Sequence, residues 1–226
     1  MPSSAEKPPL RTGEVANFAA LGFKLEKIPD FNLPAEFKSP FGVDLTWLKE
    51  IADRRLIHLT ELLPSQHQKW VDTRKIAQNP MQAYPLDYLA SVIAKLRQNR
   101  QIPRTIQNGN TSVELPTGSR LGMTPAEINE GVIPEAAKLL GVSASAIRMP
   151  KISELLYINW INKIFEPSPN LAMEWTNTEF FDEAEKANLL GNLTLGKKGE
   201  NTTLHFWPTA ETTRIPNIGF RLIVSA

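Results

Sequence analysis

Residues 148–157, Arg-Met-Pro-Lys-Ile-Ser-Glu-Leu-Leu-Tyr, give the clearest indication of how this chain folds. Serine is a residue type that caps helix N-termini, so we expect a helix that begins at Ser153 and is entered through Pro150. After Ser153 the apolar residues recur at helical spacing, which predicts one buried face. The residues of this face are Leu156, Trp160, Ile161, Ile164 and Phe165.

Two strands are predicted near the end of the sequence. Residues 203–207, Thr-Leu-His-Phe-Trp, are rich in aromatic and β-branched types, and Pro208 is expected to end this strand. Phe220, Leu222 and Val224 occupy alternate positions, as in a strand with one buried face. These strands and the preceding helix predict a mixed core in the last third of the chain.

Three charged side chains are spread over this last third, namely Arg148, Glu174 and Arg221. Arginine and carboxylate groups form strong, charge-assisted hydrogen bonds when they lie inside a protein. We therefore expect these residues to hold the core together, in preference to binding a ligand.

The last third of the chain, from Ile147 to Val224, also resembles the formylglycine-generating enzyme (sulfatase-modifying factor) family, whose fold is of the C-type-lectin type. Residues 148–157 resemble the family segment Arg-Leu-Pro-Thr-Glu-Ala-Glu-Trp-Glu-Tyr. Residues 173–176, Met-Glu-Trp-Thr, resemble the family's Trp-Glu-Trp-Thr. Residues 217–222, Asn-Ile-Gly-Phe-Arg-Leu, resemble its Asn-Ile-Gly-Phe-Arg-Val. The three segments occur in the family's order. The residues that carry the resemblance are Arg148, Pro150, Glu154, Tyr157, Glu174, Trp175, Gly219, Phe220 and Arg221.

The resemblance implies a fold but not the enzyme's chemistry. The family's enzymes hold copper with two cysteines, and this chain contains no cysteine. Leu171 stands where the related motif has an asparagine that contributes to a calcium site, and no counterpart of the family's Arg-Gly-Gly-Ser-Trp strand lies between Asp182 and Asn217. We therefore expect no catalytic residue, no cofactor and no metal site.

Other patterns typical of metal or phosphate sites are incomplete. His58, His67 and His205 are not spaced as ligands on one helix face. Residues 191–198 approach a phosphate-binding loop, but Lys198 replaces the hydroxyl residue, so a simple turn is expected there. The acidic group at Glu174, Glu179, Asp182, Glu183 and Glu185 and the basic group at Lys95, Arg97, Arg100 and Arg104 are both expected to be solvated surfaces.

Composition sets the class of partner. The 226 residues include 25 basic and 24 acidic side chains, so no overall field attracts nucleic acid or an anionic membrane. No run approaches the ~18 apolar residues of a membrane-spanning helix, and no export signal is evident. We therefore expect neither nucleic acid nor a membrane as a partner. The N-terminal arm favours protein subunits instead, and the expected location is the cytoplasm or a virion.

The sequence predicts an α+β protein in three parts: an extended arm at 1–40, a helical region at 41–105 and a C-type-lectin-like domain at 106–226. Alternatively, residues 41–226 form one domain. The helical region should hold two short helices within 44–75 and a third over 85–98. Turn signals surround a short strand at 112–115. Thr124-Pro-Ala-Glu127 is a capping-box sequence, and the helix that follows should end at Gly141.

The arm combines six prolines with many large apolar residues. Prolines disfavour helix and central strand, while the apolar groups favour contact with another surface. That surface is either the protein's own core or a neighbouring subunit. The apolar residues concerned are Phe18, Leu21, Phe23, Leu25, Ile28, Phe31 and Leu33.

Together these features predict a non-catalytic recognition or assembly protein, such as a structural subunit of a phage virion, that forms homo- or hetero-oligomers through its arm. One alternative is a receptor- or ligand-binding variable protein of the retroelement-diversified type, which uses the same fold. The other is a divergent enzyme of the sulfatase-modifying family.

Overall fold

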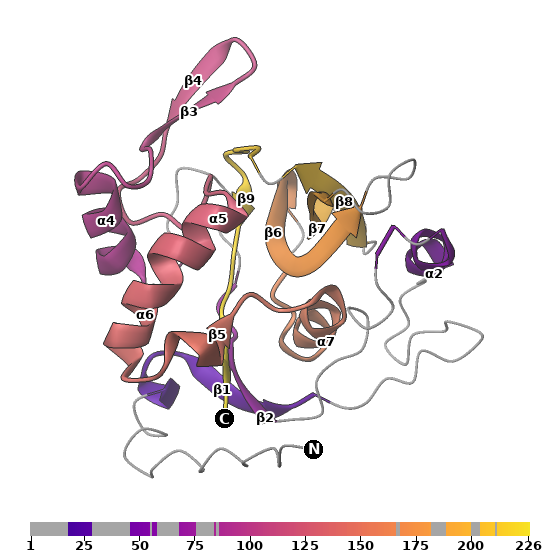
Figure 1. Ribbon diagram of the computed structural model, residues 1–226, viewed down its shortest axis with the longest axis horizontal. Coiled ribbons are helices and arrows are strands. Elements are labelled where there is room, and N and C mark those ends of the chain that lie inside the picture. The colour runs from indigo at the N-terminus through magenta and orange to yellow at the C-terminus, as the bar shows by residue number, and fades with distance from the viewer. Residues whose placement is uncertain are drawn as a thin grey trace.

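The structure is a computed structural model that describes residues 18–28, 46–54, 56–57, 68–75, 84, 86–165, 168–181, 189–199, 204–210 and 212–226. Within these residues the chain forms two four-stranded sheets, a separate two-stranded hairpin and several helices. Helices α4 and α6 lie on one side of the molecule, and α7 with the second sheet lies on the other (Figure 1). The arrangement is α+β, as the sequence predicts.

The first sheet joins segments that are far apart in the sequence. Its strand order is β1 (Phe23–Lys27), β2 (Gln68–Asp72), β10 (Ile223–Ser225) and β5 (Ile147–Arg148), and all its pairs are antiparallel. Val224 lies opposite Trp70 on one side and Ile147 on the other. Segments from both sides of residue 105 therefore share one sheet.

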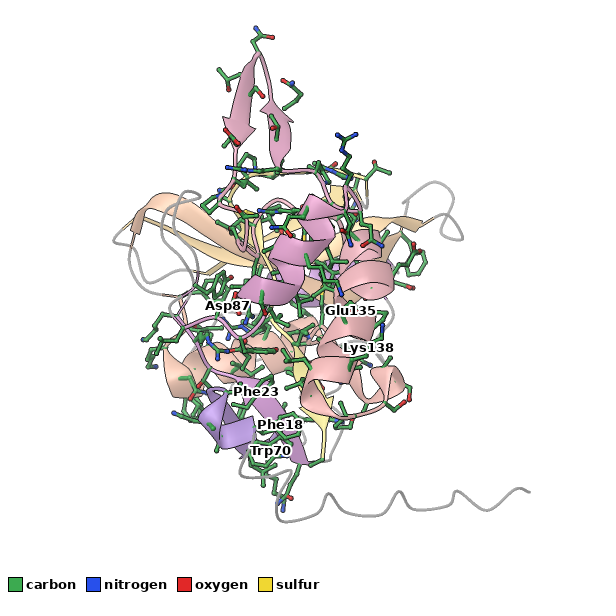
Figure 2. The ribbon with its side chains drawn as sticks, turned by 90° about the vertical axis from the view of Figure 1, so that its left-hand side faces the viewer. Phe18, Phe23, Trp70, Asp87, Glu135 and Lys138 are labelled. Carbon is green, nitrogen blue, oxygen red and sulfur yellow. The ribbon has the colours of Figure 1, made fainter. Side chains whose placement is uncertain are left out.

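The described part of the arm packs on its own chain. Phe18 and Phe23 are buried, and the Phe18 ring stacks on Trp70 at a centroid distance of 5.3 Å (Figure 2). Strand β1 pairs along its whole length with β2. Residues 18–28 thus pack on the core of their own chain. Residues 1–17 and 29–40 lie outside the described residues.

The helical region contains a strand that the sequence analysis did not predict. Helix α2 (Thr46–Asp53) agrees with the first of the two helices expected within 44–75, but residues 68–72 form β2. Trp70 and Val71 have types that favour strands, and pairing with both β1 and β10 buries them. Residues 58–67 lie outside the described residues.

The second sheet has the strand order β8 (Leu204–Ala210), β7 (Leu189–Gly199), β6 (Ser168–Phe181) and β9 (Ile218–Gly219). The turn expected at 191–198 was wrong, because these residues lie in β7, which pairs with strands on both sides. Pro208 does not end its strand either. Strand β8 is at the edge of the described sheet, where a missing N–H is tolerated.

Helix α4 (Ala90–Gln98) begins later than expected. Leu86 has a positive φ of 49° and is 96% exposed, so it does not belong to the buried face. The Asp87 carboxylate accepts a hydrogen bond from the Leu89 N–H at 2.9 Å and so holds the chain at the start of the helix. This bond lies in the turn before the helix, whose N-cap residue, Leu89, has no side-chain cap.

One continuous helical segment runs through α5 (Pro125–Glu127), a π-helical turn η1 (Ile128–Val132) and α6 (Ile133–Leu140). The predicted capping box is confirmed, since Thr124 and Glu127 bond each other's backbone N–H groups. The predicted end is confirmed too, with Gly141 at φ 69°. A 3₁₀ turn, η2 (Ala144–Ala146), then leads into β5.

Helix α7 (Ile152–Asn162) differs from the prediction in its cap and in its buried face. Lys151 is the N-cap, and Ser153 is buried within the first turn. Leu156, Ile164 and Phe165 are buried as expected, but Trp160 and Ile161 are 39% and 43% exposed. The helix is apolar nearly all round, so spacing alone did not identify the side that packs.

The core lies on both faces of the first sheet. Trp70 and Val224 belong to a cluster shared with α4 and α6, while their neighbours Val71 and Ile223 belong to a cluster shared with α7. The final strand is therefore buried on both faces, and the half-buried strand expected there was wrong. In the described residues, no helix is long and apolar enough to cross a membrane.

Candidate functional site

A group of buried ionisable side chains links the first sheet to the second. It joins the end of β2, the segment before α4, the loop before α5, strand β6 and the segment before β10. Asp72, Arg120, Glu174 and Arg221 each have an exposed fraction of 0%. We call these four residues, with Arg74, Tyr84, Asp87 and Tyr88, the buried charge cluster.

Arg221 and Glu174 form the first half of the cluster. Nε of Arg221 donates to Oε2 of Glu174 at 2.6 Å, and Nη2 donates to Oε1 at 2.9 Å. The remaining Arg221 donors reach the backbone carbonyls of Asp72 and, at 3.1 Å, Arg74. The Tyr84 hydroxyl donates to Glu174 Oε1 at 2.8 Å. This pairing confirms the expected link between Glu174 and Arg221 and ties β6 to the end of β2.

Gly219 leaves the space that Tyr84 occupies in this half of the cluster, because glycine has no side chain. A Cβ atom at this position would lie 2.6 Å from the Tyr84 hydroxyl and 3.1 Å from Cδ2 of Leu121. A larger residue would therefore push Tyr84 away from Glu174. Each residue of the Gly-Phe-Arg sequence at 219–221 thus has a role in the interior. Gly219 leaves room for Tyr84, Phe220 buries its ring, and Arg221 binds Glu174.

Arg120 forms the second half of the cluster. Nε and Nη2 donate to the two carboxylate oxygens of Asp87 at 2.7 and 2.6 Å, and Nη1 lies 2.7 Å from Oδ2 of Asp72. The guanidinium carbon also lies 4.9 and 5.3 Å from the ring centroids of Tyr84 and Tyr88. Arg120 is therefore held by two carboxylates and two aromatic faces at once.

The electrostatics of the cluster favour the charged forms. Burial alone would raise the pKa of Asp72, but the guanidinium groups of Arg120, Arg221 and Arg74 outweigh it and lower that pKa below its ordinary value. Burial, together with the Glu174 carboxylate, raises the pKa of Tyr84 well above 10.0. These pKa shifts keep Tyr84 neutral and Asp72 ionised.

Arg148, which is partly exposed, and the buried Glu154 form a separate ion pair at the start of α7. Nη1 and Nη2 of Arg148 donate to Oε2 and Oε1 of Glu154 at 2.6 and 2.7 Å. Glu154 also accepts from the Lys151 N–H at 2.8 Å, which helps to place the N-cap at Lys151, two residues before the predicted cap Ser153. The carbonyl of Pro150 accepts from the Asn177 N–H at 2.8 Å and so links this turn to β6.

The remaining residues of the resemblance also have defined positions. Trp175 and Phe220 are fully buried in the same cluster, as expected for one core. Nε1 of Trp175 donates to the Met123 carbonyl at 2.8 Å. Tyr157 is half-buried, and its hydroxyl donates to the Lys27 carbonyl at 3.4 Å, next to the end of β1.

Sequence analysis did not single out Asp72, Tyr84, Asp87 or Arg120. Nothing in the local sequence distinguishes Arg120 from a surface arginine, because its two carboxylate partners lie 33 and 48 positions earlier in the sequence. The two charged surfaces it predicted are not uniform. Glu174 and Arg97 are buried, whereas Asp182, Glu183 and Glu185 lie outside the described residues.

The chemistry open to the buried charge cluster is limited by its pairing. Both oxygens of Asp72, Asp87 and Glu174 contact a guanidinium or a backbone N–H, and these atoms are shielded from solvent. Within the described ranges, no three histidine or acidic residues are grouped so as to hold a metal ion. Two of its atoms have no hydrogen-bond partner: the buried Tyr88 hydroxyl, and Oδ2 of Asp72, which is in ion-pair contact with Arg120. The other contacts give the cluster the features of a structural network.

The most exposed feature is the hairpin of β3 (Thr105–Asn108) and β4 (Thr111–Glu114), which extends away from the other elements in both views (Figures 1 and 2). Gly109 has φ 61° at the first position of its two-residue turn, as in a type II′ turn. The exposed side chains are Thr105, Gln107, Asn110, Thr111, Ser112 and Glu114.

The hairpin is firmly joined to the body at its root. Ile106 packs with Leu115 and Leu121 in a small buried cluster. Arg97 of α4 donates to the carbonyls of Pro116 and, at 3.0 Å, Leu121, and burial lowers the pKa of Arg97 to about 10. The hairpin is thus anchored to the body at its root.

Comparison with protein-family models, with curated proteins and with solved structures finds no match for this chain.

Proposed function

We propose that this chain is a non-catalytic recognition or assembly protein on a C-type-lectin-like scaffold, with protein subunits as its partners, as in a virion or another large particle. The observation that carries the proposal is the contrast between two parts of the molecule. The charged groups of the buried charge cluster pair with one another in the interior, while a hairpin whose residues 105–113 carry no charge projects from the surface.

The C-type-lectin-like assignment is supported by how the three resembling segments meet. Residues 148–157 contact β6 through Pro150 and Asn177, and β6 contacts residues 217–222 through Glu174 and Arg221. Strand β9 also pairs with β6 at Gly219 and Glu174. Segments that resemble one family in sequence thus form a single interior, which is what a shared fold requires.

The non-catalytic assignment is supported by the state of the buried charge cluster. General acids, bases and nucleophiles need an approach for substrate and at least one lone pair or proton free to react. Here Glu174 and Asp87 each accept hydrogen bonds on both carboxylate oxygens, and Arg120 and Arg221 are fully buried. Such a cluster stabilises a scaffold.

The recognition surface is placed on the hairpin, because the described part of the arm is already packed on its own chain. A preformed element loses little conformational entropy when it binds. The hairpin is preformed by its root contacts and offers hydroxyl and amide side chains on both strands.

The proposal is tested by shortening the hairpin without disturbing its root. Residues 107–112 are replaced by Asn-Gly, so that Ile106 and Val113, which face each other, flank a new two-residue turn. Because Ile106 remains in place, the melting temperature should change by no more than about 4 °C. The native mass of the chain in extracts of the cells that express it should fall, as measured by gel filtration with immunodetection.

The control is Leu86→Asn, a change at a side chain that is 96% exposed and far from the hairpin in sequence. It should leave the native mass unchanged. A shortened hairpin that keeps the parental native mass contradicts the proposal, and so does an assembly lost equally in both variants.

A further inference from the structure

The hydrogen-bond register of the hairpin fixes which backbone groups face outward. The Leu115 N–H donates to the Arg104 carbonyl at 2.9 Å, so Arg104 and Leu115 are a hydrogen-bonded pair. Bonded and non-bonded pairs alternate in an antiparallel ladder. Thr105 with Glu114, and Gln107 with Ser112, are therefore non-bonded pairs, and their N–H and C=O groups point away from the hairpin.

Both outer edges of the hairpin are open in the described structure. β3 and β4 form a sheet of two strands, and no other described strand pairs with either of them. Proteins that remain monomeric usually protect such edges by keeping the strands very short or by placing charged residues, prolines or bulges on them, and of these devices β3 and β4 have the short length, four residues each. Residues 105–113, Thr-Ile-Gln-Asn-Gly-Asn-Thr-Ser-Val, contain no charge and no proline, and the register has no bulge.

The charge pattern favours a second copy of the same hairpin as the partner. Arg104 and Glu114 pair with each other at 3.0 Å at the base, so each hairpin is neutral and does not repel another. An antiparallel strand edge is complementary to itself, because the outward N–H and C=O groups of one copy meet those of the other across a two-fold axis. Two copies then form one four-stranded antiparallel sheet.

We propose that this hairpin is a self-association element, in which the outward N–H groups of Gln107 or Ser112 pair with the same edge of a second copy of the chain. The inference rests on the proposed function, since it names the first partner of the recognition hairpin. Strands of four residues bury little surface, so the pairing is weak and depends on protein concentration. Many copies in one particle strengthen such contacts through effective concentration.

The first test measures the purified full-length chain by sedimentation velocity over a hundredfold range of concentration, and amide hydrogen exchange by NMR at both ends of that range. The sedimentation coefficient should rise with concentration. Exchange of the outward N–H of either Gln107 or Ser112 should slow in step with it, while the inward N–H groups of Ile106 and Val113 stay protected throughout. A chain that stays monomeric, or a dimer in which neither outward N–H is protected, overturns the inference.

The second test uses the double variant Gln107→Pro with Ser112→Pro. Proline removes both outward N–H groups, and the inward bonds of the hairpin do not use them. This variant should remain monomeric at every concentration. The matched control, Gln107→Thr with Ser112→Thr, keeps both N–H groups and should associate like the parent. Strand pairing is contradicted if the proline variant still associates, or if the threonine variant no longer associates.

The failure of self-pairing is distinguishable from the failure of the proposed function. If the purified chain is monomeric but the shortened hairpin still lowers the native mass in extracts, the hairpin binds a different subunit and only self-pairing is wrong. If the shortened hairpin also leaves the native mass unchanged, both are wrong.

Discussion

The guanidinium groups of Arg120 and Arg221 organise the interior because each presents several donors in one plane. Arg221 reaches a carboxylate and two backbone carbonyls, and Arg120 reaches two carboxylates. A lysine has neither the planar fork nor the number of fixed donors. Removing one partner from such a pair leaves a buried charge without compensation, which costs far more than the pair itself contributes.

We predict that Asp87→Asn, which removes one partner of such a pair, destabilises the protein strongly. The oxygen of the asparagine amide can still accept a hydrogen bond from the Leu89 N–H, but the amide no longer neutralises Arg120, so the free energy of unfolding should fall by ~3–5 kcal/mol. Urea titration of the purified protein measures it. The control is Glu135→Gln, which breaks an exposed pair with Lys138 at 2.5 Å on α6 (Figure 2) and should leave the urea midpoint unchanged. Equal effects of the two variants would contradict the role of the buried pair.

A second prediction concerns the contact between Gly219 and Tyr84. Gly219→Ala places a methyl group 2.6 Å from the Tyr84 hydroxyl and should destabilise the protein by ~1–3 kcal/mol. Tyr84→Phe removes the atom that the methyl group meets. In a double-mutant cycle the combined variant should therefore lose less stability than the sum of the single variants. Strict additivity would show that the two residues do not interact.

At the level of helices and strands, the sequence predicted best where local chemistry decides the outcome. Thr124, Glu127 and Gly141 bound their helix as expected, because caps depend on neighbours within a few positions. β2 was missed because Trp70 pairs with residues 25 and 224, which are far away in sequence. The packing side of α7 was missed because apolar residues surround the helix, so their spacing did not show that Trp160 is exposed. The resemblance identified Glu174 and Arg221, but Asp72, Asp87 and Arg120 meet only through the tertiary fold.

Two glycines in the α5–η1–α6 segment should respond in opposite ways to alanine. Gly141 has φ 69° with open space around it, so Gly141→Ala should cost ~1–2 kcal/mol through backbone strain alone. Gly131 lies within the helical segment and would place a Cβ atom only in ordinary contact with Leu96, at 3.8 Å. Gly131→Ala should be neutral or stabilise the protein by up to ~1 kcal/mol. Thermal unfolding of both variants measures the difference, and the same sign for both would contradict the assigned helix end.

For the molecule as a whole, the depressed pKa of Asp72 predicts sensitivity to acid. A carboxylate whose pKa is lower in the folded than in the unfolded state stabilises the fold above its unfolded pKa, and this contribution is lost as pH falls through the folded value. The free energy of unfolding should therefore decline below about pH 4. Asp72→Asn, although less stable at pH 7, should show a smaller decline between pH 5 and pH 2. An unchanged decline would assign the acid sensitivity to other groups.

The absence of cysteine leads to a further prediction for the complete chain. Protein purified without chelators should contain less than a tenth of an equivalent of copper, iron or zinc by elemental analysis. One equivalent of any of these metals would contradict the non-catalytic assignment and favour the divergent-enzyme alternative.

The position of β10 between β2 and β5 has a consequence for how the protein is made. The first sheet pairs residues about 150 positions apart, so neither face of the core can close until residues 223–225 have left the ribosome. Until then β1 and β2 form an incomplete sheet whose apolar side chains, Trp70 and Val71 among them, are open to other nascent chains. Contacts of such long sequence separation also form slowly. Newly synthesised chains should therefore depend on chaperones, and ribosome-bound chains that stop before residue 223 should be digested by protease far faster than the finished protein.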